Sequence, residues 1–209
     1  MEQTTDPIQQ QLIDARRSQI LDAATQVFAA KGYHRATIRD IAKVAGIADG
    51  TIYTYFANKA ALVLGLMARL NQSDERPAHF TQGAAAAPAE FMRGYFRQRM
   101  ALLGENATVF RAVLPELLAN AELRATYREQ TLQPTLAIAE RFLAEQMAAG
   151  ALRTADAAAT ARVLAGMVLG VLLLRLLGDE ELEQEWDRVT DVMATIVLDG
   201  ILQGDDNND

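Results

Sequence analysis

The sequence predicts an all-α protein of about nine helices, with three short helices at the N-terminus and a larger C-terminal bundle. Hydrophobic residues make up 50% of the 209 residues, enough to bury a sizeable core, and only 5 residues are proline. Apolar residues recur at the i, i+3, i+4 and i+7 spacing of an amphipathic helix through most of the chain. Signals built from Gly, Pro and Asn divide it into segments of helical length.

Charge is distributed unevenly along the chain, whose net charge is −7. Residues 1–60 hold 7 Lys/Arg and 6 Asp/Glu, a balance of +1, whereas residues 61–209 hold 13 and 21, a balance of −8. A near-neutral N-terminal region with several arginines can still contact phosphate groups, and an acidic distal part limits non-specific binding. The overall acidity therefore does not exclude a nucleic-acid partner.

The N-terminal segment begins with a polar, Gln-rich arm at residues 1–13, which we expect to be mobile in the free protein. The arm lacks the apolar stretch of a secretory signal peptide. A first helix is expected from Arg16 to Lys31, with Ile20 and Phe28 on its apolar face and Gly32 as its stop.

Two short helices joined by a tight turn follow. Thr37 is suited to cap the first, with Asp40 completing a capping box, and Gly46 can end it in the left-handed conformation. The second helix is expected over residues 49–56, with Ile52 facing inward. This is a helix-turn-helix pattern, whose second helix can lie in a DNA major groove. On spacing alone, an ordinary helical hairpin is an equal alternative.

Lys59 favours DNA binding over the hairpin alternative. It follows Asn58, a good N-cap, so it places a cation in the first turn of a fourth helix. The helix dipole disfavours positive charge there by about 0.3 to 1 kcal/mol. A DNA phosphate beside the helix start would account for the lysine.

The segment 36–62 resembles the DNA-binding motif of the tetracycline-repressor (TetR) family of transcriptional regulators. The resemblance rests on Thr37, Ile41, Ala42, Ala45, Gly46, Gly50, Thr51, Ile52, Tyr53, Tyr55, Phe56, Asn58, Lys59 and Leu62. It implies a homodimer of all-helical subunits, with a DNA-binding domain at residues 1–60 and a ligand-binding and dimerisation domain at 61–204. A disordered tail is expected at 205–209.

The same resemblance assigns roles at the DNA surface. Arg39, Thr51 and Thr54 lie where base edges are read, with Asp49 as a further candidate, and Thr37, Tyr53, Tyr55 and Lys59 match positions that touch phosphates. Gly50 belongs to the same motif. The chain departs from the family pattern at Ala48, where a capping Ser or Thr is common, at Asp49, and at Ala60 and Ala61, where Glu is frequent.

The C-terminal part begins with the fourth helix, from Lys59 to about Asn71, and continues into a linker over residues 73–88. Pro134 is expected to kink a long helix. Further helices are expected over residues 88–103, 107–113, 115–120, 122–149, 156–177 and 180–203, with Gly104, Gly150 and Gly178 as stops.

Eight residues, most of them large and apolar, are candidates to line a pocket between these helices: His79, Phe91, Tyr95, Met100, Phe110, Leu114, Leu118 and Phe142. The alternative, that they fill an ordinary core, stays open. The expected ligand is small and mostly apolar. Glu90, Glu116 and Glu140 leave open whether it is also cationic.

The last two long helices are the candidate dimer surface. The uncharged run 163–174 is too short to span a bilayer, for which about 18 apolar residues are needed. It is apolar nearly all round, so it needs cover on more than one side. The interface candidates are Ala161, Ala165, Gly166, Leu169, Leu173, Trp186, Val189, Met193 and Ile196, with close packing inside one subunit as the alternative for the small residues.

Residue usage argues against the other functional classes. There is no cysteine, and Lys31 and Arg76, not Glu, stand three positions before His34 and His79, so the Glu-x-x-His pairs of a di-iron helical bundle cannot be built. No nucleophile elbow, phosphate loop or H-E-x-x-H motif occurs, so we expect no enzyme activity and no cofactor. The sequence predicts a cytoplasmic, ligand-responsive regulator, most simply a repressor that binds a palindromic double-stranded DNA operator as a homodimer, without a membrane partner. A helical protein-interaction module that does not bind DNA is the alternative.

Overall fold

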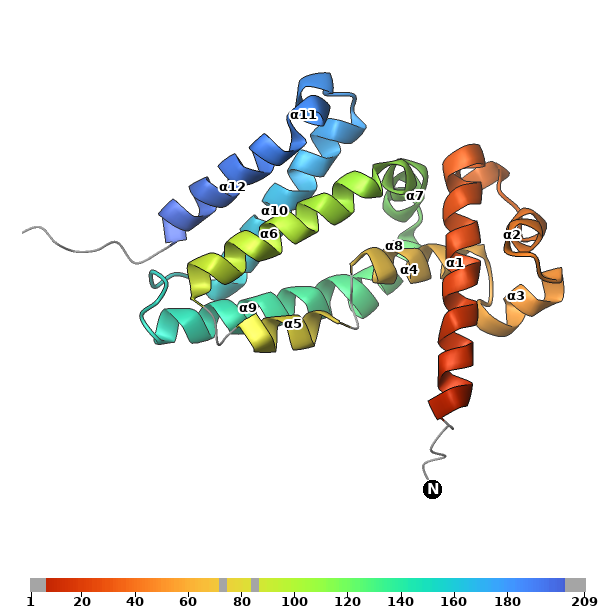
Figure 1. Cartoon of the computed structure of the whole chain (residues 1–209), viewed down its shortest axis with the longest axis horizontal. Helices are drawn as coiled ribbons and strands as arrows, with labels where there is room; N and C mark the ends of the chain where they lie inside the picture. Colours follow the sequence, from red (N-terminus) through yellow and green to blue (C-terminus); the bar gives the residue numbers. More distant parts are fainter. Residues whose placement is uncertain (1–6, 72–74, 84–86, 202–209) are drawn as a thin grey trace, which may run out of the picture. The chain divides into compact units, whose positions relative to one another are not determined.

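The computed structural model describes residues 7–71, 75–83 and 87–201, and over these ranges it contains helices and no strand (Figure 1). The all-α prediction is confirmed. The helices form two compact units: one contains the chain up to Arg69 together with Thr108–Tyr127, and the other contains Leu70–Ala107 and the chain from Arg128 onward. The expected tail at 205–209 lies outside the described residues.

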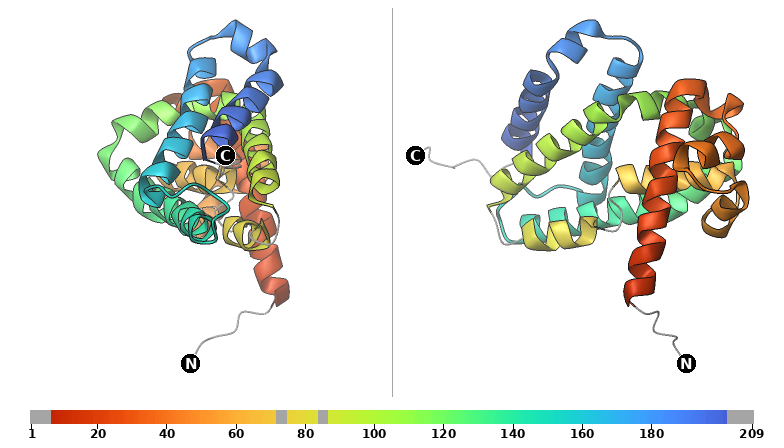
Figure 2. Two further views of the ribbon diagram at one scale, coloured as in Figure 1. Left: turned by 90° about the vertical axis from the view of Figure 1, so that its left-hand side faces the viewer. Right: turned by 45° about the vertical axis from the view of Figure 1, so that its right-hand side comes forward.

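The first unit is built around α1 (Pro7–Arg35), with α2 packed against it and α3 against α2 (Figures 1 and 2). Residues 7–13, expected to be a mobile arm, are the start of α1. A proline in the first turn followed by Gln and Leu favours helix, which explains the difference. Gly32, at φ 72°, is non-helical and separates the last residues from the rest. The remaining helices of this unit are α2 (Ile38–Ala45), α3 (Asp49–Tyr55), α4 (Lys59–Leu70), α7 (Ala107–Ala119) and α8 (Ala121–Tyr127).

The caps expected around the helix-turn-helix are confirmed. The Thr37 hydroxyl accepts from the Asp40 N–H at 3.1 Å, and the Asp40 carboxylate accepts from the Thr37 N–H at 3.1 Å. Gly46 adopts φ 67°, the left-handed conformation that ends α2. Hydrogen bonds to Thr37 and Lys31 lower the pKa of Asp40 to about 2, with Lys31 the larger cause. The capping box therefore stays ionised until well into the acid range.

The second unit contains a helix that the sequence did not predict. Helix α5 (Arg76–Gly83) lies within the stretch expected to be a linker, because Phe80 is buried and contributes to the core. Residues 72–74 and 84–86 of that stretch lie outside the described residues. The other elements of this unit are α6 (Pro88–Glu105), a π-helical segment (Arg128–Leu132), α9 (Gln133–Ala148), α10 (Ala157–Leu176), α11 (Glu180–Gln184) and α12 (Trp186–Ile201).

Several other helix boundaries differ from prediction. Pro115, expected to begin a second helix, lies inside α7, since Val113 and Leu117 are buried and hold both halves in one helix. The expected helix 122–149 is interrupted by the π-helical segment just before Pro134. The expected helix 180–203 divides at Glu185 into α11 and α12. These divisions and α5 explain why the structure has more helices than predicted.

Gly104 was expected to end a helix but lies inside α6. A Cβ at this position would lie 2.8 Å from Trp186 Nε1 and 2.9 Å from an Arg175 nitrogen. The Trp186 indole packs in this space and donates to Met100 O at 3.0 Å. Gly104 is therefore required by the close approach of α12 to α6.

We expect Gly104→Val to displace the indole and lower the free energy of unfolding by about 1 to 3 kcal/mol, the usual effect of overpacking. Trp186 is the single tryptophan of the chain, so urea unfolding followed by its fluorescence measures both effects. Gly94→Val in the same helix is the matched control, because among the described atoms a Cβ there meets nothing within 4 Å. Equal losses in the two variants would contradict this role for Gly104.

Candidate functional site

The outward surface of α2 and α3 carries the predicted DNA contacts. Thr37, Arg39, Gly50, Tyr53 and Thr54 are exposed. Thr51 and Tyr55 are half-buried, so only part of each side chain is accessible. An exposed tyrosine and threonine beside an exposed arginine form a surface able to donate hydrogen bonds to phosphates and base edges.

Arg39 and Asp49 form an ion pair across the turn between α2 and α3. Arg39 Nε lies 3.2 Å from Asp49 Oδ2, and both side chains are well exposed. The carboxylate therefore orients the guanidinium at the outer surface, where its other nitrogens can contact a base or a phosphate. This arrangement gives Asp49 a positioning role beside the base-reading role suggested by the sequence.

Lys59 is placed differently from the prediction. Its ammonium donates to Tyr33 O at 2.7 Å, Ala36 O at 3.0 Å and His34 O at 3.4 Å, and lies 4.2 Å from the centre of the Tyr33 ring. Burial lowers the pKa of Lys59, while the nearby Glu116 carboxylate opposes that shift. Because these carbonyls occupy the ammonium, we propose that Lys59 joins the start of α4 to the connection between α1 and α2, and the phosphate contact stays a prediction.

Further contacts that sequence reasoning missed hold the helix-turn-helix in place. Arg17 donates to Tyr55 O at 3.1 Å and lies over the Phe56 ring, so it closes the end of α3. Gln19 donates to Ala45 O at 2.7 Å at the end of α2. These partners lie far apart in sequence, so no local pattern could have revealed them.

Glu116 on α7 is also part of this framework. Its side chain is 11% exposed, and one of its oxygens lies 3.4 Å from His34 Nε2. Burial and, to a smaller extent, the Glu116 charge raise the pKa of Tyr33. Glu116 therefore belongs to the framework of the DNA-binding unit.

In the second unit, five aromatic rings from α5, α6 and α9 form an aromatic cluster of His79, Phe80, Phe91, Tyr95 and Phe142. Ring centroids lie 4.9 Å apart for Phe91 and Phe142 and 5.3 Å apart for His79 and Phe91. The cluster brings together four of the predicted pocket residues, His79, Phe91, Tyr95 and Phe142. Phe80 was not among the predicted residues, because its segment was taken for a linker.

The other predicted pocket residues lie elsewhere. Met100 is fully buried on α6, whereas Phe110, Leu114 and Leu118 belong to α7 of the first unit. Leu118 is 61% exposed, which removes it from an enclosed pocket. Beside the cluster lies an open hollow of about 260 Å³, lined by Phe80, Thr81, Ile138, Arg141, Phe142 and Glu145.

Two buried arginines connect the cluster to the end of α4. Arg99 on α6 donates to Leu70 O at 3.2 Å, and Arg76 on α5 donates to Asn71 O. Arg76 also lies 6.0 Å from the centre of the Tyr95 ring. On the α9 side, the Asn71 amide donates to Thr135 at 2.6 Å. Each of the three helices that carry the cluster, α5, α6 and α9, therefore forms a hydrogen bond with Leu70 or Asn71, where the chain leaves α4.

These arginines bear on the charge of the ligand. A cationic ligand was left open because of three glutamates, but Glu90 is exposed and Glu116 belongs to the first unit. Glu140 is half-buried on α9. The charged side chains that are buried among the described residues, Arg76 and Arg99, are both basic, so a cationic ligand would find no buried carboxylate there.

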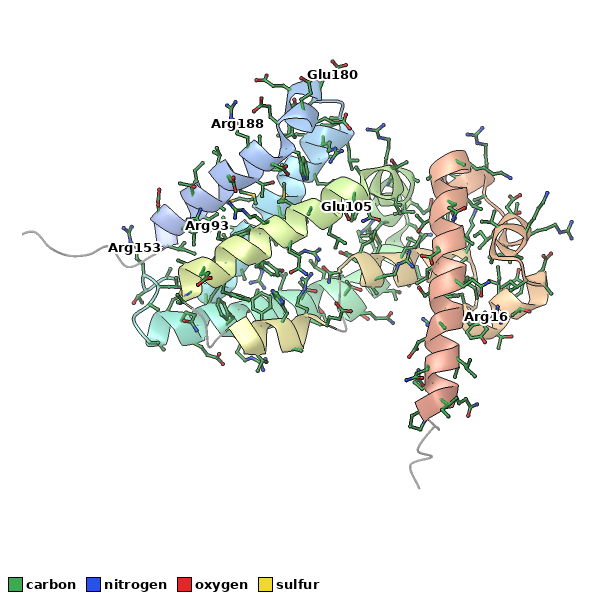
Figure 3. All side chains as sticks on the ribbon, in the orientation of Figure 1. Arg16, Arg93, Glu105, Arg153, Glu180 and Arg188 are labelled. Carbon is green, nitrogen blue, oxygen red and sulfur yellow. The ribbon has the colours of Figure 1, made fainter. Side chains whose placement is uncertain are left out.

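Exposed apolar side chains lie on both α10 and α12. Val163 is 61% exposed, Leu173 48% and Ile196 60%. Among the described atoms, a Cβ on Gly166 or Gly170 would meet nothing within 4 Å, so these glycines are not required by packing inside the subunit. The side chains of Glu180 and Arg188 point outward from α11 and α12 (Figure 3).

The structure revises the candidate interface residues. Ala161 and Met193 are buried within the chain, and Trp186 is held by Met100 and Gly104, so these three offer little surface to a second subunit. Ala165 and Val189 are half-buried. Gly166, Leu169, Leu173 and Ile196 remain exposed.

Comparisons with known proteins agree with this architecture. A model described as bacterial regulatory proteins, tetR family, matches residues 20–66, and one described as AefR-like transcriptional repressor, C-terminal domain, matches residues 90–199. Over 136 residues the chain is 33% identical to the fatty acid metabolism regulator protein of Bacillus subtilis (strain 168), a match covering 65% of this chain and 70% of that protein.

Solved structures show the same fold. FadR from Bacillus subtilis in complex with stearoyl-CoA has a TM-score of 0.68 at 27% identity, covering 85% of this chain and 97% of that chain. SmeT, the repressor of a Stenotrophomonas maltophilia multidrug efflux pump, in complex with triclosan has a TM-score of 0.72 at 24% identity, covering 91% and 93%. The second likeness shows the fold alone. On the family-model matches and the 33% identity to the Bacillus protein, the chain belongs to the TetR family of bacterial transcriptional regulators.

Proposed function

We propose that the chain is a cytoplasmic repressor that binds a palindromic operator as a homodimer and releases it when a small, mostly apolar ligand binds. The observation that carries the proposal is the capped helix-turn-helix with Arg39, Tyr53 and Thr54 exposed on its outer surface. Its relatives are transcriptional regulators, which disfavours the alternative of a protein-interaction module that does not bind DNA.

The aromatic cluster is the proposed ligand site. Buried aromatic rings with few polar groups are typical of small-molecule sites. FadR from Bacillus subtilis has been crystallised with stearoyl-CoA, whose acyl chain is apolar. For this chain, the absence of a buried carboxylate among the described residues supports a neutral ligand over a cationic one.

The proposed coupling runs through the α4 terminal clamp, which we define as Arg76, Arg99, Asn71 and Thr135. A ligand that separates the cluster rings shifts the helices that carry these residues. Their hydrogen bonds to Leu70 and Asn71 then change, and α4 follows. A palindromic operator has two half-sites, so it binds both recognition helices of the dimer only when these helices lie at a fixed separation. Such a shift would therefore release the DNA.

Selection of bound duplexes from a random DNA pool tests this function. We expect a palindromic consensus, and we expect Arg39→Ala to relax the preference at one base of each half-site by about 1 to 3 kcal/mol. Arg93→Ala, on the exposed surface of α6, is the control for loss of one positive charge. Failure to enrich any duplex would favour the protein-interaction alternative.

A further inference from the structure

We propose that His79 Nε2 is the hydrogen-bonding anchor of the ligand site, and that the ligand carries a hydroxyl group on an aromatic ring. This inference rests on the proposed function, because it specifies the ligand to which the regulator responds. It concerns a residue in the second unit alone and does not depend on how the chain contacts DNA.

The first observation is an unpaired polar atom. His79 Nε2 is buried, and none of the described residues offers it a hydrogen-bond partner. Buried polar groups are nearly always paired, because leaving one unpaired forfeits the hydrogen bonds it makes with water. A ligand oxygen at this position would restore the missing bond.

The second observation is the surroundings of that atom. The His79 ring centroid lies 5.3 Å from that of Phe91, 6.0 Å from that of Tyr95 and 6.4 Å from that of Phe80. Several pairs in the cluster meet edge to face, with interplanar angles of 73° for Phe80 and Phe91 and 78° for Phe80 and Phe142. A further aromatic ring inserted among them makes the same favourable contacts.

The third observation is a place for entry. Phe80 and Phe142 belong both to the cluster and to the lining of the neighbouring hollow of about 260 Å³. A cavity of about 150 Å³ holds benzene, so the hollow suits a ring with a short substituent. Movement of the two phenylalanines would bring such a ring to His79.

A hydroxyl group fits this anchor because it can donate and accept. The imidazole Nε2 is a donor in one neutral tautomer and an acceptor in the other, and a hydroxyl satisfies either. A carboxylate can only accept, so it requires the protonated Nε2, although the nearby Arg76 would favour its charge. A hydroxyl-bearing ligand and a carboxylate-bearing ligand are therefore tested separately.

The test compares 4-ethylphenol, ethylbenzene and 4-ethylbenzoate by calorimetric titration of the full-length dimer. We expect the phenol to bind at least about tenfold more tightly than ethylbenzene, as one buried hydrogen bond allows. In His79→Leu, ethylbenzene should bind as before and the preference for the phenol should disappear. His79→Phe serves the same purpose should the leucine variant fail to fold.

The two histidines of the chain supply a direct spectroscopic readout. In long-range proton–nitrogen spectra, 4-ethylphenol should shift the His79 Nε2 signal. His34, exposed and paired with Glu116, should not respond, and a His34→Gln variant assigns the two rings.

Three outcomes would overturn the proposal: a phenol preference that survives in His79→Leu, tighter binding of 4-ethylbenzoate than of the phenol, or no binding of any of the three. Operator binding is measured separately on the selected duplex. If it is intact while the phenol preference is absent, the ligand class alone is wrong. If wild type binds no operator, the proposed function fails.

Discussion

Replacing Lys59 with Met is expected to destabilise the DNA-binding unit and to leave the salt dependence of DNA binding nearly unchanged. The ammonium holds the carbonyl groups of Tyr33, His34 and Ala36 together at the end of α1. Hydrogen bonds from a charged donor contribute about 1.5 to 3 kcal/mol to the free energy of unfolding. Because this lysine is partly exposed, we expect the variant to lose about 2 kcal/mol.

Urea unfolding and DNA titrations at several salt concentrations distinguish this role from a phosphate contact. The slope of log K against log salt is negative. Loss of one phosphate contact makes it less steep by about 0.9, whereas replacing a structural lysine leaves it within about 0.3 of wild type. Lys43→Met, at an exposed lysine on α2, is the control for stability. A slope less steep by about 0.9 with unchanged stability would show that Lys59 contacts a phosphate, as the sequence predicts.

Local signals made the helix-turn-helix predictable. The Thr37–Asp40 capping box spans three positions and Gly46 closes the same helix, so both depend on neighbours in sequence. Such contacts form wherever the chain is helical. The apolar periodicity of α2 likewise identified Ile41 and Ala45 as buried.

Features that depend on distant partners could not be read in this way. Lys59 finds its acceptors 23 to 26 positions earlier, and Trp186 donates to a carbonyl 86 positions earlier. Helix α5 forms where composition suggested a linker, because Phe80 is buried among rings of α6 and α9. Tertiary packing overrides local propensity at these places. Four of the predicted pocket residues lie together for the converse reason, since large aromatic residues usually pack against one another in a core.

Replacing Leu173 with Glu is expected to separate the dimer into folded monomers and to lower operator affinity by at least about a hundredfold. Leu173 is half-exposed in the subunit, on the apolar face of α10, beside Leu169 and Gly166. A second copy that covers this face would bury the new carboxylate without a partner, at a cost of several kcal/mol. Affinity then falls because a monomer engages one half-site and loses the gain from simultaneous binding of two.

Gly166→Leu tests the same surface through size instead of charge. Since a Cβ there meets none of the described atoms within 4 Å, any loss of association reflects contact with a second subunit and not strain inside the first. Leu12→Glu is the matched control, because Leu12 is 67% exposed on α1 of the first unit, whereas the proposed interface belongs to the second unit. Light scattering at micromolar concentration reports the oligomeric state, and circular dichroism confirms that each variant is folded.

A membrane is the rival partner for this face, because α10 has the length and composition of a membrane span and only 17% of that window is buried. The uncharged run between Arg162 and Arg175 is, however, shorter than the ~18 residues that a bilayer requires. Val192 and Ile196 of α12 are also exposed, so apolar surface is not confined to the one helix that resembles a membrane span. We therefore expect wild type to stay in the supernatant when sedimented with lipid vesicles. Vesicle binding that Leu173→Glu abolishes, with no change in oligomeric state, would assign the face to lipid instead.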